Sequence, residues 1–158
     1  MYNLTKYHTS FSENPHSDSA CDTSSVILMA MEEGGSYAKS DNALVRMSYE
    51  FALKAVRFSE LLESNKKFVI SHQFLKSATS VAANVIESQH SESRADFIHK
   101  LKIASKELQE AEFWLNLCKD SPSYPNPGTI MSDTLPLKKL LSSIISTAKK
   151  NAQRSNEF

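Results

Sequence analysis

Two carboxylate–histidine pairs are the residues of this chain whose types and spacing could hold a metal ion. Glu87 and His90 stand three residues apart, and so do Asp96 and His99. Di-iron sites in helical bundles use two such pairs that project inward, with two further glutamates from the other helices. Here His90 falls at an expected helix end and Asp96 at a capping position. The sequence therefore favours solvated helix-end residues over a metal site.

The two additional glutamates are also missing from the expected inner faces. The acidic residues of the first expected helix, which lie off its apolar seam, are Glu50, Glu60 and Glu63. The last expected helix, over residues 135–152, contains no acidic residue. With only three glycines, the chain also offers no loop to cradle a phosphate. We therefore expect a protein that is not an enzyme and that uses no metal or cofactor.

Basic side chains form a second candidate site, suited to the phosphates of a nucleic acid. The six that we single out are Lys54, Arg57, Arg94, Lys100, Lys102 and Lys106. If they cluster on one face, they can follow a phosphate backbone through salt-sensitive attraction. Acidic residues share the same helices, and that mixture is typical of solvated faces with supporting ion pairs. Charge alone leaves both interpretations open.

The charge of the whole chain is balanced but unevenly distributed. Residues 1–40 carry two basic against five acidic side chains, a net charge of −3. The remainder carries 16 basic against 13 acidic side chains, a net charge of +3. A mildly basic domain behind an acidic tail is compatible with nucleic acid, although its charge is far below that of a dedicated binder.

Cysteines and apolar runs restrict the location of the protein. Cys21 and Cys118 suggest no disulfide framework, and the position of Cys118 on an apolar stripe indicates a small buried side chain. No run of about 18 apolar residues predicts a membrane span. The short run Val26–Met31 lacks the basic region that precedes the core of a signal peptide. The expected location is the cytoplasm, with no membrane partner.

The expected helix over residues 93–120 carries the most regular apolar stripe of the chain. Its members recur at alternating steps of four and three: Phe97, Leu101, Ala104, Leu108, Ala111, Leu115 and Cys118. Such a stripe means that the helix lies lengthwise against other helices at shallow crossing angles. Phe113, Trp114 and Leu117 add apolar surface beside the stripe, which either core packing or an interface explains.

Three further apolar patterns predict helices over residues 41–64, 68–89 and 135–152. Asp41 or Asn42 is the expected N-cap of the first helix and Ser93 that of the third, whereas Pro136 falls in the first turn of the last. Short connections between long helices predict an all-α fold, an up-down-up-down antiparallel four-helix bundle. We expect this domain over residues 41–152, after a disordered acidic tail over 1–40 and before a frayed C-terminus over 153–158.

Three ordered segments resemble one known family. Residues 74–88 read F-L-K-S-A-T-S-V-A-A-N-V-I-E-S, and the other two segments are Ser93–Leu115 and Ser143–Asn151. The first is similar to the signature of the four-helix-bundle proteins encoded in intervening sequences of ribosomal RNA genes. That signature is hydrophobic-basic-Ser-x-x-Ser-hydrophobic-x-x-Asn-hydrophobic-x-Glu. The resemblance covers residues 44–151, which is essentially the whole domain.

The resemblance implies an up-down four-helix bundle that assembles into a ring-like homopentamer. The biochemical role of the family is not established. A related branch, the accessory proteins of diversity-generating retroelements, is similar in fold. Its pentamers have a basic surface, bind nucleic acid and partner a reverse transcriptase. This comparison makes RNA or DNA, and a reverse transcriptase, candidate partners at the level of fold.

Four polar residues of the second helix match the family pattern position by position: Ser77, Ser80, Asn84 and Glu87. The last three share a face, since they are four and three residues apart. We expect a hydrogen-bonded polar seam with Glu107 or Lys106 of the third helix, which would be structural rather than catalytic. The family often has Gly where Ala78 and Ala82 stand here, so the closest helix contact is expected to be slightly wider.

The sequence thus predicts a non-enzymatic, homo-oligomeric bundle that associates with nucleic acid through the six basic residues. The alternative is an interaction scaffold, whose excess apolar surface on residues 93–120 docks a protein without touching RNA or DNA.

Overall fold

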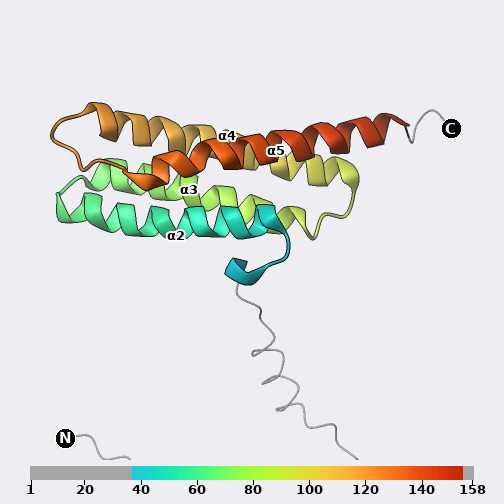
Figure 1. Ribbon diagram of the computed structural model, residues 1–158, viewed down its shortest axis with the longest axis horizontal. Helices are drawn as coiled ribbons and strands as arrows, with labels where there is room; N and C mark the ends of the chain where they lie inside the picture. Colours follow the sequence, from blue (N-terminus) through green and yellow to red (C-terminus); the bar gives the residue numbers. More distant parts are fainter. Residues whose placement is uncertain (1–36, 155–158) are drawn as a thin grey trace, which may run out of the picture. The chain divides into compact units, whose positions relative to one another are not determined.

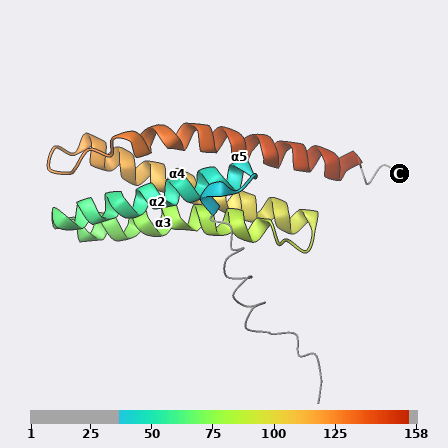
Figure 2. The same cartoon turned by 60° about the horizontal axis from the view of Figure 1, so that its bottom comes forward.

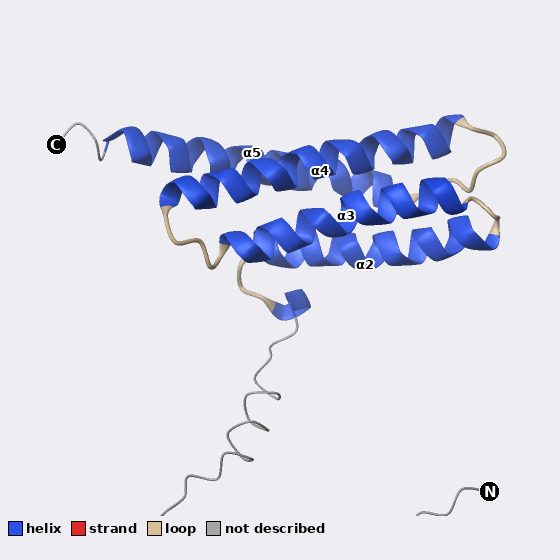
Figure 3. Ribbon diagram, turned by 180° about the vertical axis from the view of Figure 1, so that it is seen from behind, coloured by secondary structure: helices blue, strands red, loops and turns tan. Residues whose placement is uncertain are grey.

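The computed structural model describes residues 37–154, and in that part of the chain it contains four long helices and no strand. They are α2 (Ala43–Ser64), α3 (Phe68–Ser88), α4 (Arg94–Asp120) and α5 (Thr129–Arg154), after a single 3₁₀ turn, η1 (Tyr37–Lys39). Each helix runs back along the one before it (Figure 1), and the view from behind shows only short loops between them (Figure 3). The predicted all-α four-helix bundle is confirmed.

The predicted tail and frayed end lie mostly outside the described residues, as does the run Val26–Met31. The turn η1 begins four residues before the predicted domain and packs against α2. The ring of Tyr37 packs against that of Tyr49 with 5.6 Å between centroids, and the Arg46 guanidinium donates to the Ser40 carbonyl over 2.7 Å.

The order of the helices follows from which of them are neighbours. Helices α2 and α3, α3 and α4, and α4 and α5 pack in sequence, and α5 closes the bundle against α2. No Cα atom of α2 lies within 8 Å of one in α4. The first and third long helices are therefore diagonal to each other, as the up-down topology requires.

The apolar stripe of α4 lies in the core as predicted. Six of its members are buried, from Leu101 to Cys118, and only Phe97 in the first turn is half-buried. Helices α2 and α3 meet this stripe with aromatic side chains. The rings of Phe58 and Phe74 lie edge to face, 5.5 Å apart and at 85°. Small residues such as Ala78 and Ala104 are completely buried, which lets the backbones of α3 and α4 approach closely.

Both predicted helix starts with a polar cap are confirmed. The Asn42 side chain accepts from the amides of Leu44 and Val45, so Asn42 rather than Asp41 caps α2. The Ser93 hydroxyl accepts from the Asp96 amide over 3.1 Å at the start of α4. These bonds satisfy donors that have no partner inside a helix.

The prediction for the last helix was wrong at its start. Helix α5 begins at Thr129 rather than near residue 135, so Pro136 lies inside the helix and not in its first turn. Gly128, with φ +57°, ends the preceding loop, and buried Ile130 anchors the extra turns in the core. Pro136 is exposed, so the carbonyl four residues earlier, which loses its partner, can be hydrated.

The two halves of α5 differ in how much they bury. Ile130, Thr134, Leu137 and Leu141 are buried, whereas no side chain from residue 142 to residue 153 is. Its last turns extend beyond the other three helices (Figures 1 and 2). At that end of the bundle, α5 has turned from a core helix into one wall of an open groove.

Candidate nucleic-acid interface

The six predicted phosphate contacts are divided between two helices that are diagonal to each other in the bundle. Lys54 and Arg57 lie on α2, whereas the other four lie on α4 or at its first residue. Because α2 and α4 are diagonal, one copy of the chain cannot present all six to the same stretch of nucleic acid. The separation of the six residues follows from the up-down order of the helices, so it could be deduced from the predicted topology.

On α2, the candidate surface is reduced by an ion pair with α5. The Lys54 ammonium lies 2.6 Å from the Asp133 carboxylate, which offsets its charge. Arg57, one turn further along, is exposed. Among the described residues, no carboxylate pairs with the Arg57 guanidinium. A single uncompensated cation is a weak anchor for a phosphate backbone.

On α4, Lys100 is also paired. Its ammonium donates to the Glu87 carboxylate of α3 over 2.6 Å. The hydrogen bond and the charge of Glu87 raise the pKa of Lys100 above its ordinary value. Both side chains are partly exposed, so the pair contributes little to stability. It does remove Lys100 from the cations that are available to a phosphate.

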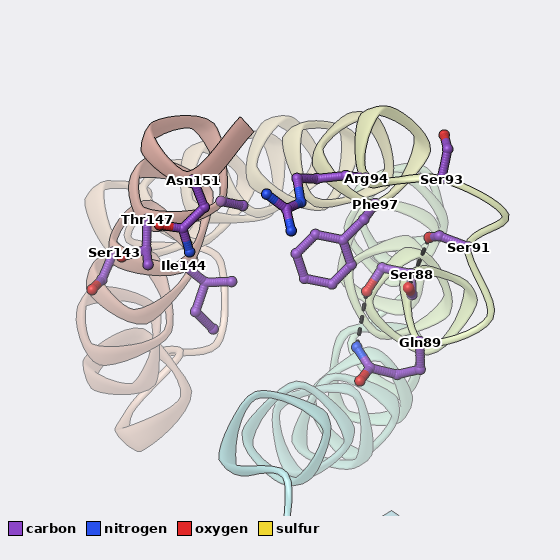
Figure 4. A pocket seen from close by; sticks show the side chains of 11 residues that line it. Ser88, Gln89, Ser91, Ser93, Arg94, Phe97, Ser143, Ile144, Thr147 and Asn151 are labelled. Carbon is purple, nitrogen blue, oxygen red and sulfur yellow. Dashed lines mark hydrogen bonds between the residues drawn. The ribbon is translucent and has the colours of Figure 1, made fainter. Parts of the chain in front are cut away.

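Three of the four predicted cations on α4 remain unpaired within the described part of the chain. Arg94, Lys102 and Lys106 are exposed, and none makes an ion pair there. Lys102 and Lys106 are four residues apart and share the outer face of the helix. Arg94 lies about 18 Å before Lys106 along the helix axis, at 1.5 Å per residue, and its side chain is on the side of α4 that faces α5 (Figure 4). This α4 cation row, Arg94, Lys102 and Lys106, is the part of the predicted surface that the fold leaves available.

The predicted polar seam lies along the contact between α3 and α4, but its hydrogen bonds run mainly within α3. Buried Ser77 donates to the carbonyls of Gln73 and Phe74, and the Asn84 amide donates to the carbonyl of Ser80 over 2.9 Å. The interhelical bond from this face is the one from Lys100 to Glu87. Between residues 37 and 154, neither Lys106 nor Glu107 bonds to it, so a seam through these two residues stays a prediction.

The carboxylate–histidine pairs of the sequence do not converge. Within residues 37–154, no group of three His, Cys, Asp or Glu side chains is placed to hold a metal ion. Glu87 pairs with Lys100, and His90 and His99 are both exposed. In the same residues, no helix is long and apolar enough to cross a membrane.

Cys118 is buried in the core, where burial raises the pKa of its thiol. A thiol is far less nucleophilic than a thiolate, so this position suits packing rather than covalent chemistry. Cys21 lies outside the described residues.

Several large apolar side chains are exposed within about two turns of the bundle end where α2 and α4 finish and α3 and α5 begin. Phe113 and Leu117 of α4 are 52% and 40% exposed, whereas Trp114 is half-buried against the core and its indole N–H donates to Glu110. The other helices add Leu61, Phe68, Val69 and Leu135 at the same end. We call these six exposed residues the apolar end: Leu61, Phe68, Val69, Phe113, Leu117 and Leu135.

The opposite end of the bundle holds a groove that the sequence did not reveal. It has a volume of about 590 Å³ and lies between the α3–α4 turn and the last turns of α5. Figure 4 shows Arg94 and Phe97 on one wall, Ile144 on the other and Gln89 at the side of α3. One sequence signal could have pointed to a basic surface at this end. Residues 134–154 contain five basic residues and no acidic one.

The fold and the surface together define a class, that of small helical-bundle proteins whose candidate binding residues are exposed on the outside of the helices. The family model for the 23S rRNA-intervening sequence protein matches residues 40–131. The chain belongs to this family, as the signature over residues 74–88 predicted.

A solved structure agrees with this assignment. A protein of unknown function from the S23 ribosomal protein family of Bacteroides thetaiotaomicron is 40% identical and superposes with a TM-score of 0.62. The match covers 65% of this chain and 98% of that one. No curated protein matches the sequence.

Proposed function

We propose that this protein is a non-enzymatic, homo-oligomeric bundle that binds RNA or DNA through the α4 cation row. The single observation that carries the proposal is the row itself: three exposed cations over about 18 Å of one helix, without ion pairs in the described chain. Lys and Arg that neutralise phosphates release counterions, which provides sequence-independent affinity.

Two further facts support a nucleic acid as the partner. The family is described by its link to 23S ribosomal RNA, so RNA is the nucleic acid that we propose first. Helix α5 adds Lys149 and Lys150, both exposed, near the Arg94 end of the row. A cytoplasmic location, where RNA and DNA are both accessible, fits this proposal.

Assembly is part of the proposal because three cations bind weakly. A ring of copies repeats the α4 cation row, and several weak contacts in one particle give a higher overall affinity than each contact alone. The apolar end supplies surface that a second copy can bury. Assembly also brings the α2 cation Arg57 of one copy within the same particle as the α4 row of another. A reverse transcriptase as protein partner rests on the related branch alone.

The test is a salt titration of binding with the full chain and a fluorescein-labelled single-stranded RNA. Affinity should fall steeply as salt rises, with a logarithmic slope that decreases by about 0.7 for each lysine removed from a single-strand contact. The test variant is Lys102→Gln/Lys106→Gln. Lys119→Gln, with one exposed cation removed outside the row, is the control and should leave the slope unchanged. Binding with no salt dependence, or with the same slope in the double variant, would contradict the proposal.

A scaffold function is the second candidate, and Phe113 and Leu117 favour it. An apolar end of this kind is typical of a protein-binding surface. If the chain bound no RNA or DNA at low salt, and Phe113→Ser/Leu117→Ser abolished a protein complex, the scaffold would replace the first proposal.

A further inference from the structure

The groove between the α3–α4 turn and the last turns of α5 combines Arg94 of the α4 cation row with apolar and uncharged polar side chains. Eleven residues line it, and three of them are apolar: Phe97, Ile144 and Ala148. The other eight carry hydroxyl, amide or guanidinium groups. Its volume of about 590 Å³ lies in the range of pockets that hold small ligands, about 300–1,000 Å³.

The side chains of the α3–α4 turn are held in place by their own hydrogen bonds. The Gln89 amide donates to the Ser88 hydroxyl over 3.0 Å, and its carbonyl oxygen accepts from Asn42 over 2.8 Å. The Ser91 hydroxyl donates to the Ser88 carbonyl over 2.7 Å. This wall is therefore preorganised, and a ligand would not have to order it.

Arg94 provides the charge at the groove. Its side chain points into the space between α4 and α5, on the same side as the Phe97 ring (Figure 4). Lys149 and Lys150 follow directly after Ala148, which lines the opposite wall. The surroundings are thus complementary to an anion, whereas the floor is aromatic and aliphatic.

We propose that this groove holds one unstacked nucleotide of a single-stranded nucleic acid, with its base against Phe97 and Ile144 and its phosphate at Arg94. The inference rests on the proposed function and adds a preference for single strands. A base needs an apolar face to stack on and polar groups at its edges, and the groove offers both. An alkyl chain carries no phosphate for the Arg94 guanidinium and offers no hydrogen-bonding groups to the polar side chains that line the groove.

The test compares a fluorescein-labelled decauridylate with the same strand annealed to its complement, using the full chain. Phe97→Leu keeps an apolar side chain in the core contact but removes the ring. It should weaken single-strand binding by about fivefold or more and leave duplex binding unchanged. Phe97→Tyr keeps the ring and should retain single-strand binding. Arg94→Gln should weaken the single strand more than Lys119→Gln, the charge-matched control at the other end of α4.

Cross-linking provides a readout that does not depend on stability. A decauridylate with one central 4-thiouridine should cross-link to the tryptic peptide Ala95–Lys100, which carries Phe97. Cross-links confined to Ile103–Lys106 on the outer face of α4 would overturn the groove as the site.

The outcomes separate the two proposals. If RNA binding shows the expected salt dependence and Lys102→Gln/Lys106→Gln lowers its slope, but Phe97→Leu binds like the wild type, the groove is overturned and the proposed function stands. If the wild type binds neither single strand nor duplex, both are overturned. If palmitate binds the groove and does not compete with decauridylate, the groove is a site for an alkyl chain.

Discussion

The two ends of the bundle are built from the same four helices but present opposite surfaces. At the end where α3 and α5 begin, core residues of all four helices are buried and several large apolar side chains are exposed, with Phe68 at 60% and Phe113 at 52% exposure. At the other end, α5 no longer buries its side chains, and the space is lined by hydroxyls, amides and Arg94.

This difference shows how one bundle can separate two tasks. A closed end with exposed apolar residues suits contact with another protein surface, because burying them stabilises the contact. An open, basic end suits a ligand that carries phosphate. We therefore propose that the apolar end serves assembly and that the α4 cation row and the groove contact nucleic acid.

The largest expected effect comes from breaking the closed end. Phe74 is completely buried and packs edge to face on Phe58, so Phe74→Ala should lower the free energy of unfolding by about 3–5 kcal/mol. Ile144 lines the groove and is half-buried, so Ile144→Ala should cost about 1 kcal/mol. Urea denaturation at one protein concentration measures both. Equal losses would mean that the two ends are packed alike.

A smaller effect is expected from the cap beside the groove. Ser93→Ala removes the hydroxyl that accepts from the Asp96 amide and should cost about 1 kcal/mol of stability. Ser142→Ala, at an exposed position inside α5, is the control. If the loss is confined to the start of α4, hydrogen exchange should accelerate at Arg94–Phe97 before it does in α2. Uniform acceleration would show that this end does not open independently.

The smallest effect concerns the pair between Glu87 and Lys100. Because Glu87 raises the pKa of Lys100, the pair contributes below the ordinary lysine pKa of 10.5 and is lost as the pH rises through the raised value. Glu87→Gln should therefore shift the melting temperature only slightly at pH 7, and the difference should vanish at strongly alkaline pH. A difference that grows with rising pH would contradict this sign.

Much of the fold could be predicted from residue spacing and from local capping residues. The burial of the stripe from Leu101 to Cys118 was predicted correctly, because steps of four and three place all its members on one face of a helix. Ser93 was correct because an N-cap is a local property of the residues that follow it. The start of α5 was predicted wrongly because a proline early in an apolar pattern resembles a helix start. The helix instead begins after Gly128, and buried Ile130 holds its first turn in the core.

The candidate site was less predictable because it depends on distances between helices. From the sequence, Lys54 and Lys106 were both predicted to contact one nucleic acid, but α2 and α4 are diagonal in the bundle, which separates the two lysines. The ion pairs of Lys54 with Asp133 and of Lys100 with Glu87 join residues that are distant in sequence. The groove was missed because Phe97 and Ile144 have the spacing of core residues, and only the extension of α5 beyond its neighbours leaves them uncovered.

The most direct test of the division between the two ends is the solution mass of the full chain by light scattering, at low and high salt. The account predicts a homopentamer of about five times the chain mass of 17.7 kDa at both salt concentrations. Phe113→Ser/Leu117→Ser should dissociate it, whereas Arg94→Gln should not. A monomer at 17.7 kDa for the wild type would contradict assembly through the apolar end and the affinity that assembly provides.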